Sequence, residues 1–217
     1  MTMTREFCLA IAATSLLLAS CGKPSAPAAG SEPPSAGALA PSAARAFAPS
    51  ATAEKALPVV KGQPGDIPDT QLFIKFRSAS GGYSVEAPEG WARTENGGSV
   101  EFTDHFDGEQ VSVSAGAAAV TVDSVQARQV PAIRAGARAV TIEGVTRTTL
   151  GNGTTVIEIA YSSNSEPDIV TGKQVRLSDV TYLYYRRGTV AALTLWAPSG
   201  ADNVDQWKRI SESFRWQ

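Results

Sequence analysis

The stretch Val180-Thr-Tyr-Leu-Tyr-Tyr-Arg186, Arg187-Gly188, Thr189-Val-Ala-Ala-Leu-Thr-Leu-Trp-Ala197 carries the strongest strand signal in the chain. Its two halves are rich in β-branched and aromatic residues and flank a short turn, which predicts a β-hairpin. Apolar side chains alternate onto both faces, as Tyr184 and Leu183 do. A strand that is apolar on both faces is typical of the middle of a sheet that is covered on both sides.

Residue patterns typical of β-strands continue on the N-terminal side of this hairpin. We predict further strands at 72–76, 83–87, 99–103, 111–115, 140–142, 145–150 and 154–162. Asp107-Gly108 is a turn signal and predicts a hairpin between the third and fourth of these strands. The polar segment 163–173 is predicted to be an exposed loop.

Two segments have helical spacing instead. The first runs from Thr121 to about Ala135, where Thr121 or Asp123 can cap the start and Pro131 indicates a kink or a break. The second opens at Asp202, the predicted N-cap, near the end of the chain. Its apolar stripe consists of Trp207, Ile210 and Phe214.

Two motifs frame this order of elements. Tyr83-Ser-Val-Glu-Ala-Pro-Glu-Gly-Trp91 leads a strand into Pro-x-Gly-Trp, and Ile210-Ser-Glu-Ser-Phe-Arg-Trp216 closes the last helix on Ser-Phe. Together they resemble the PsbP-like family over about Leu72 to Gln217. The resemblance implies an α+β domain at 70–217, with an antiparallel β-sheet covered by helices as an α/β/α sandwich. Members of this family include an accessory subunit of photosystem II and bacterial lipoproteins without assigned activity, so the resemblance implies no catalytic residues.

The first 20 residues predict a signal peptide, with Arg5, a short apolar run and small residues before Cys21. The sequence Leu18-Ala-Ser-Cys21 resembles a bacterial lipobox, in which the cysteine sulfur receives a lipid. Cys21 is therefore the predicted lipidation site, and the chain is expected to sit on a membrane outside the cytoplasm. Gly22 permits the outer membrane in a Gram-negative source, and a Gram-positive source would place the protein at the cell surface. The alternative is an ordinary secretory signal in which Cys21 is incidental.

Residues 21–69 are rich in Ala, Pro and Ser and contain few large apolar side chains. Such a segment cannot offset the entropy lost on ordering, so we predict a disordered tether. It is either a spacer that lets the domain reach a partner or a neutral linker.

Composition excludes several classes of function. A net charge of −2 does not favour nucleic acid as a partner. The two cysteines, Cys8 and Cys21, both lie at the processed end, so the mature chain has no thiol for a disulfide or a zinc cluster. His105 is the single histidine. We expect no cofactor.

One acidic loop could carry chemistry. Asp104, Asp107 and Glu109 surround His105, and three carboxylates can hold a divalent cation. The spacing is not that of a calcium loop, however, and acidic hairpin tips are common solvated turns, so we predict no metal site. The sequence contains no nucleophile elbow, phosphate loop or dinucleotide fingerprint, which favours a protein that is not an enzyme.

Aromatic side chains are the remaining feature. They would form a contact surface if exposed, but packing between helices and sheet is the favoured interpretation. The set comprises Trp91, Trp196, Trp207, Trp216, Tyr182, Tyr184 and Tyr185. The sequence as a whole predicts an exported lipoprotein with a non-catalytic accessory or protein-binding role in the cell envelope. The alternative is a small-molecule-binding lipoprotein with its ligand in a cleft between sheet and helices.

Overall fold

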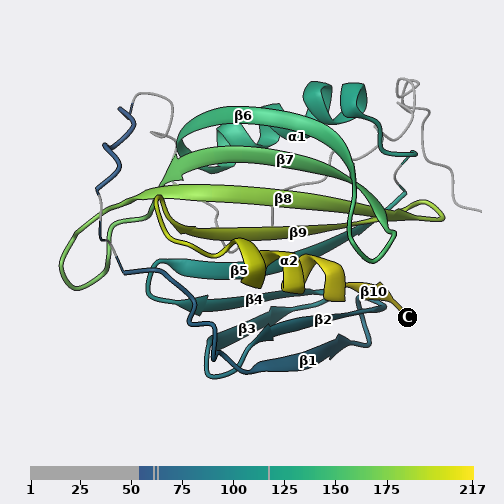
Figure 1. Ribbon diagram of the computed structural model, residues 1–217. Helices are drawn as coiled ribbons and strands as arrows, with labels where there is room; N and C mark the ends of the chain where they lie inside the picture. Colours follow the sequence, from purple (N-terminus) through teal and green to yellow (C-terminus); the bar gives the residue numbers. More distant parts are fainter. Residues whose placement is uncertain (1–53, 61, 63, 117) are drawn as a thin grey trace, which may run out of the picture. The chain divides into compact units, whose positions relative to one another are not determined.

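The computed structural model describes residues 54–60, 62, 64–116 and 118–217. Within these ranges β8 (Arg176–Arg186) and β9 (Thr189–Pro198) form the predicted hairpin in the middle of a seven-stranded antiparallel sheet, in the order β3-β4-β5-β9-β8-β7-β6 (Figure 1). The other strands are β3 (Ala92–Asn96), β4 (Ser99–Asp104), β5 (Asp107–Ala115), β6 (Arg138–Thr149) and β7 (Thr155–Asn164).

A second, three-stranded sheet joins the start of the domain to the end of the chain. It contains β1 (Phe73–Ser78), β2 (Tyr83–Pro88) and the short β10 (Arg215–Trp216), with β2 in the middle. Because Trp216 pairs with Tyr83, the last residues of the chain are part of the fold.

Both faces of the large sheet are covered, as the hairpin pattern requires. Leu183 and Val190 pack on one face with Val125 of α1 (Val122–Gly136). Tyr184 and Leu193 pack on the other face, where α2 (Val204–Ser213) and the small sheet lie. Figure 1 shows α1 behind the large sheet and α2 in front of it. The predicted α+β class, an antiparallel sheet covered by helices, is confirmed.

The first helix begins at the first of the two predicted caps. Thr121 is the N-cap, and its side chain and that of Ser124 form a capping box. The helix continues through Pro131 to Gly136, so a break at the proline is wrong. Proline removes one backbone donor from the helix. Val125 is buried against the sheet and contributes to holding the helix in place.

The second helix begins one residue later than predicted. Asn203, not Asp202, is its N-cap, and the Asn203 side chain makes no capping hydrogen bond. That side chain is instead bonded to the segment that precedes β1, as described below. Capping preference alone could not predict this use of the Asn203 side chain, because its hydrogen-bond partner Ile67 is 136 residues away in the sequence.

The predicted turn at Asp107-Gly108 is also wrong. Asp107 pairs with Asp104, so the turn consists of His105 and Phe106, and β5 starts at Asp107. Gly108 lies opposite Trp196 in β9, and a Cβ atom at this position would overlap the indole ring. Glycine is therefore needed here for a close approach to an aromatic ring, not for a turn.

Two edges of the large sheet differ from the prediction. All five residues of β3 are exposed, so this strand has no apolar alternation and was not predicted. The segments 140–142 and 145–150 belong to one strand, β6, which is irregular between Ile142 and Gly144. The predicted loop at 163–173 begins later, since Ser163 and Asn164 are buried in β7.

Candidate functional site

The acidic loop is a hairpin tip in which the carboxylates have separate environments. Asp104 and His105 are exposed, and His105 Nδ1 lies 2.7 Å from Asp104 Oδ1. Asp107 is buried, and Glu109 is fully buried. Among the described residues, no three His, Cys, Asp or Glu side chains are placed to hold a metal ion.

Burial changes the acid strength of the two inner carboxyl groups. It raises the pKa of Asp107 to about 7, with further upward contributions from Asp104 and Asp66 and an opposing hydrogen bond from Asn203. Burial also raises the pKa of Glu109 well above its ordinary value. Within the described part of the chain, neither Glu109 oxygen has a hydrogen-bond partner, so the neutral acid is the favoured form.

The segment before β1 is held against the domain and forms what we call the strap, residues 54–60, 62 and 64–69. At its start, Leu57 N donates to Asn164 Oδ1 at 3.0 Å, and Asn164 Nδ2 donates to Glu54 Oε1 at 2.8 Å. Glu54 also forms an ion pair with Arg138. These contacts attach the start of the strap to the end of β7.

A second anchor holds the other end of the strap. Ile67 N donates to Asn203 Oδ1 at 2.7 Å, and Asn203 Nδ2 donates to Gly65 O at 2.7 Å. The Asp202 backbone N–H donates to Asp66 Oδ1 at 2.8 Å. Burial of the Ile67 side chain adds about 1.5–3 kcal/mol of hydrophobic stabilisation. The strap is thus fixed to the sheet at one end and to α2 at the other.

A buried arginine supports the first anchor. Arg176 donates to Asn164 Oδ1, the same oxygen that accepts from the strap, at 3.1 Å, and to Ala139 O at 2.7 Å. It also donates to Thr141 Oγ1 and Ser162 Oγ. Burial lowers the pKa of Arg176, and nearby Asp179 and Glu143 oppose that effect. Its bond to Ala139 O helps to hold Ala139 at φ 45, a left-handed conformation that is strained for alanine.

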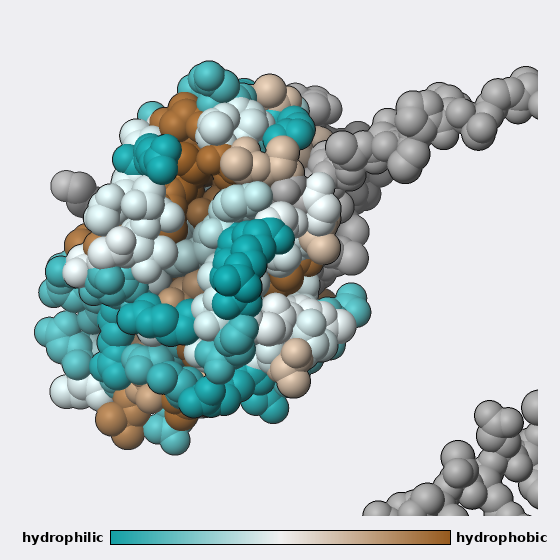
Figure 2. All heavy atoms as spheres, turned by 90° about the vertical axis from the view of Figure 1, so that its right-hand side faces the viewer, coloured by the Kyte–Doolittle hydropathy of each residue, from teal (hydrophilic) through white to brown (hydrophobic). Residues whose placement is uncertain are grey.

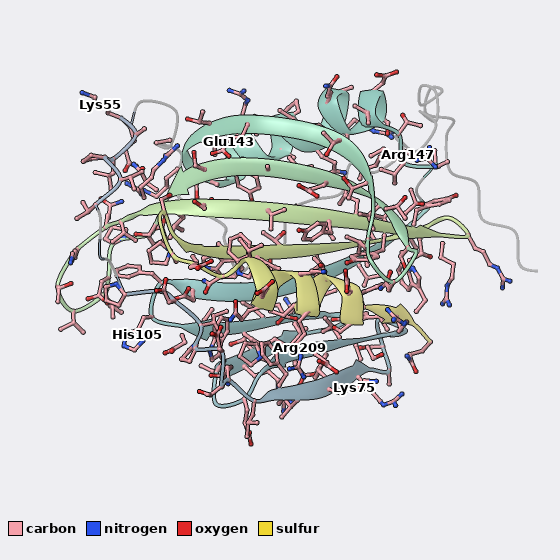
Figure 3. The ribbon with its side chains drawn as sticks, in the orientation of Figure 1. Lys55, Lys75, His105, Glu143, Arg147 and Arg209 are labelled. Carbon is pink, nitrogen blue, oxygen red and sulfur yellow. The ribbon has the colours of Figure 1, made fainter. Side chains whose placement is uncertain are left out.

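A pocket of about 230 Å³ lies where the strap meets the start of β8. Its exposed wall area is mainly apolar, although half of the lining residues are polar or charged. The lining residues are Leu57, Pro58, Val60, Lys173, Gln174, Val175, Arg176 and Ser199. The exposed side chains of Val59 and Val60 lie on the strap beside it. Figure 3 shows Lys55 pointing outward at this end of the domain.

A groove lies between α2 and β2, and unlike the pocket it is lined mainly by charged residues. It has a volume of about 410 Å³ and is lined by Glu86, Asp205, Lys208, Arg209, Glu212 and Ser213. Arg209 Nε lies 2.9 Å from Glu86 Oε2, and the Arg209 guanidinium sits 4.3 Å from the centre of the Phe73 ring. This groove is therefore open and charged. Figure 3 labels Arg209, which lies on α2.

Most of the aromatic residues pack into the interior, as the sequence favoured. Tyr184 stacks on Phe214 with ring centres 4.1 Å apart, and its hydroxyl donates to Ser211 O at 2.7 Å. Trp196 is buried, and Trp91, Trp207, Trp216 and Tyr182 pack against the core. Tyr185 alone of the seven aromatic side chains is counted among the exposed large hydrophobic residues.

Sequence reasoning missed the residues that form the pocket. Cys21, the predicted lipidation site, lies outside the described residues. Leu57, Pro58 and Val60 fell in the predicted tether, although Leu57-Pro58-Val59-Val60 is an apolar run within an Ala/Pro/Ser-rich segment. That run was the available signal. Nothing in the sequence links it to Asn164 or Arg176.

Comparison with known proteins finds solved structures that are similar to this chain at low sequence identity. No protein-family model matches the chain, and no match is found among curated proteins. The chain is similar to the solution structure of cyanobacterial PsbP (CyanoP) from Synechocystis sp. PCC 6803, at 16% identity and a TM-score of 0.48. That match covers 71% of this chain and 99% of the cyanobacterial one.

Two further solved structures are similar at the same level. One is a protein from Bacteroides thetaiotaomicron, at 14% identity and a TM-score of 0.45, which covers 66% of this chain. The match spans 48% of the Bacteroides chain, about half its length. The other is a protein of unknown function from Pseudomonas aeruginosa, at 15% identity and a TM-score of 0.40, covering 65% of this chain and 94% of that one.

We expect the free energy of unfolding to fall as pH rises from about 5 to about 8. Folded Asp107 keeps its proton up to about pH 7, whereas an unfolded aspartate loses it near pH 4. The raised pKa of Glu109 also lowers the free energy of unfolding as pH rises. The folded state binds more protons over this range, so each such group lowers stability by up to about 1.4 kcal/mol per pH unit. Urea unfolding at several pH values measures the slope.

The double variant Asp107→Asn with Glu109→Gln should flatten this slope. Glu89→Gln removes an exposed carboxylate and should leave the slope as it is. A wild-type stability that is constant or rises between pH 5 and pH 8 would contradict the assignment.

Proposed function

We propose that this protein is an exported lipoprotein, anchored through a lipid on Cys21, with a non-catalytic accessory role in the cell envelope. Its domain binds another envelope protein through the pocket under the strap. The signal-like residues 1–20 and the lipobox-like sequence before Cys21 support the anchor. The membrane is the outer membrane in a Gram-negative source and the cell surface in a Gram-positive one. Within the described part of the chain, no helix is long and apolar enough to cross a bilayer.

The pocket is the observation on which the binding role rests. Its volume of about 230 Å³ is below the roughly 300–1,000 Å³ of typical small-molecule sites. It suits one large side chain of a partner, which would contact Leu57, Pro58 and Val175. The exposed Val59 and Val60 widen the apolar surface around the pocket mouth. Apolar pockets that accept one anchoring side chain are typical of protein interfaces.

The position of the pocket fits an anchored protein. Three of its lining residues belong to the strap, and the strap is the part of the domain that the chain reaches first after Cys21. If residues 22–53 form the predicted flexible tether, its end-to-end distance is roughly 30 Å. The pocket would then stay within reach of proteins at the same membrane.

A small-molecule ligand between helix and sheet is the second candidate. The groove between α2 and β2, about 410 Å³, lies where that alternative placed its ligand. Its volume is in the typical range, but the ion pair between Arg209 and Glu86 and its open shape favour solvent over an apolar ligand. A ligand here would have to be charged.

The anchor is tested by Cys21→Ser. Without the thiol no thioether to the lipid can form, so we expect the variant to incorporate no radiolabelled palmitate and to leave the membrane fraction. Ser20→Ala changes a neighbouring residue to another small one and should keep both properties. Continued lipid incorporation by the serine variant would refute the assignment.

The binding role is tested by cross-linking in cells with a photoreactive amino acid at position 173. We expect a protein adduct that is lost when Val60→Asp places a charge at the pocket mouth, because burying an unpaired carboxylate is costly. Val204→Asp is the matched control, since Val204 is equally aliphatic, is 72% exposed and lies on α2. That variant should retain the adduct.

Two outcomes would count against the protein partner. An adduct that survives Val60→Asp would show that the pocket does not form the contact. A thermal shift with a charged small molecule that Arg209→Ala abolishes would favour the groove and the second candidate. Normal thermal unfolding of Val60→Asp confirms that the substitution acts on binding.

A further inference from the structure

The loop between β7 and β8 presents two consecutive aliphatic side chains to solvent. Ile169 is 99% exposed and Val170 is 87% exposed, more than any other large hydrophobic residue among those described as exposed. Figure 1 shows this loop projecting at the left, at the same end of the sheet as the start of the strap. Full exposure of two adjacent aliphatic side chains is unfavourable in water and marks a contact surface.

The turn that carries these side chains satisfies several of its own backbone donors. Asp168 Oδ1 accepts hydrogen bonds from Val170 N at 3.1 Å and Thr171 N at 2.7 Å. Gly172 N donates to Asp168 O, and Asp168 N donates to Lys173 O. The backbone donors of Val170, Thr171 and Gly172 therefore have partners within the turn and can leave water without losing them. Unsatisfied backbone groups are the main obstacle to placing a loop in a lipid environment.

We propose that Ile169 and Val170 insert into the interfacial region of the lipid bilayer to which the protein is anchored. The inference rests on the lipid anchor proposed at Cys21. Insertion removes both aliphatic side chains from water, and the polar groups of Asp168 and Thr171 stay at headgroup depth. Monotopic anchors bind membranes in this way, through a small buried apolar area.

The bilayer fits this tip better than a protein surface does. The tip is a convex turn of two aliphatic residues, whereas the residues that dominate protein interfaces are mainly Trp, Tyr and Arg. Lys55 and Lys173 are exposed at the same end, where they can contact lipid phosphates. Figure 2 shows the end of the domain that carries the β8–β9 hairpin tip, where hydrophilic residues are interspersed with separate hydrophobic patches.

Insertion would orient the pocket. Lys173, which lines the pocket, follows Val170 by three residues, so an inserted tip places the pocket mouth beside the lipid surface. The partner of the pocket would then be a protein that lies at or in the same membrane. A soluble partner would have to approach the pocket along the bilayer.

The test uses the full chain, processed in bacteria and purified from membranes, with Val170→Cys as its labelling site. Cys8 is removed with the signal, and the Cys21 sulfur carries the lipid, so an environment-sensitive fluorophore labels position 170 alone. The protein is reconstituted into vesicles of phosphatidylethanolamine and phosphatidylglycerol. We expect a blue shift of the emission and quenching by lipids with spin-labelled acyl chains.

Two matched proteins complete the experiment. Arg187→Cys places the label at the exposed hairpin tip at the opposite end of β8 and should show neither blue shift nor quenching. Ile169→Asp in the Val170→Cys protein should abolish both signals while the lipid on Cys21 still holds the protein on the vesicles. Together these results would establish insertion by the tip.

Three results would overturn the inference. Protein that floats with the vesicles while its label at position 170 stays in a polar environment shows that the anchor holds and the tip does not insert. A blue shift in native membranes that is absent from pure lipid shows that a protein covers the tip. Protein that does not float with the vesicles has no lipid anchor. Insertion is then also refuted, because two aliphatic side chains bind too weakly to hold a domain on a membrane.

Discussion

The burial of both faces of β8 and β9 is the constraint on which the rest of the structure depends. Leu183 and Tyr184 are adjacent in sequence, point to opposite faces and are both at most 2% exposed. Each face therefore needs its own cover. The chain supplies α1 on one side, and on the other side it supplies α2 with the small sheet that β10 completes at the end of the chain.

One end of the large sheet holds a buried cation, Arg176, and the strap is attached to the same hydrogen-bond network through Asn164. Arg176 is 7% exposed and donates only to neutral oxygen atoms in the hydrogen bonds described above. Asn164 joins this guanidinium to Leu57, and Asn203 fixes the other end of the strap beside α2. The pocket is a consequence, because the strap crosses the start of β8 while it is held at two polar anchors rather than packed along its whole length.

Sequence patterns predict the parts of this fold whose cause is local. The hairpin at Val180–Ala197, the cap at Thr121 and the packed aromatic residues were predicted because periodicity and capping are visible in neighbouring residues. The predicted turn at Asp107-Gly108 was wrong because glycine is needed at position 108 for close packing against Trp196 in another strand, not for a turn. The pocket could not be predicted at all, since it depends on hydrogen bonds between residues more than 100 positions apart.

Hydrogen exchange of the full chain tests most directly whether the strap is part of the folded domain. The backbone N–H groups of Leu57 and Ile67 each donate to a buried asparagine. We expect both amides to exchange many times more slowly than in an unfolded peptide, with Asn164→Ala accelerating Leu57 and Asn203→Ala accelerating Ile67. Exchange of both amides at the unfolded rate in the unmodified protein would show that residues 54–69 are free, and the pocket that they form would not exist.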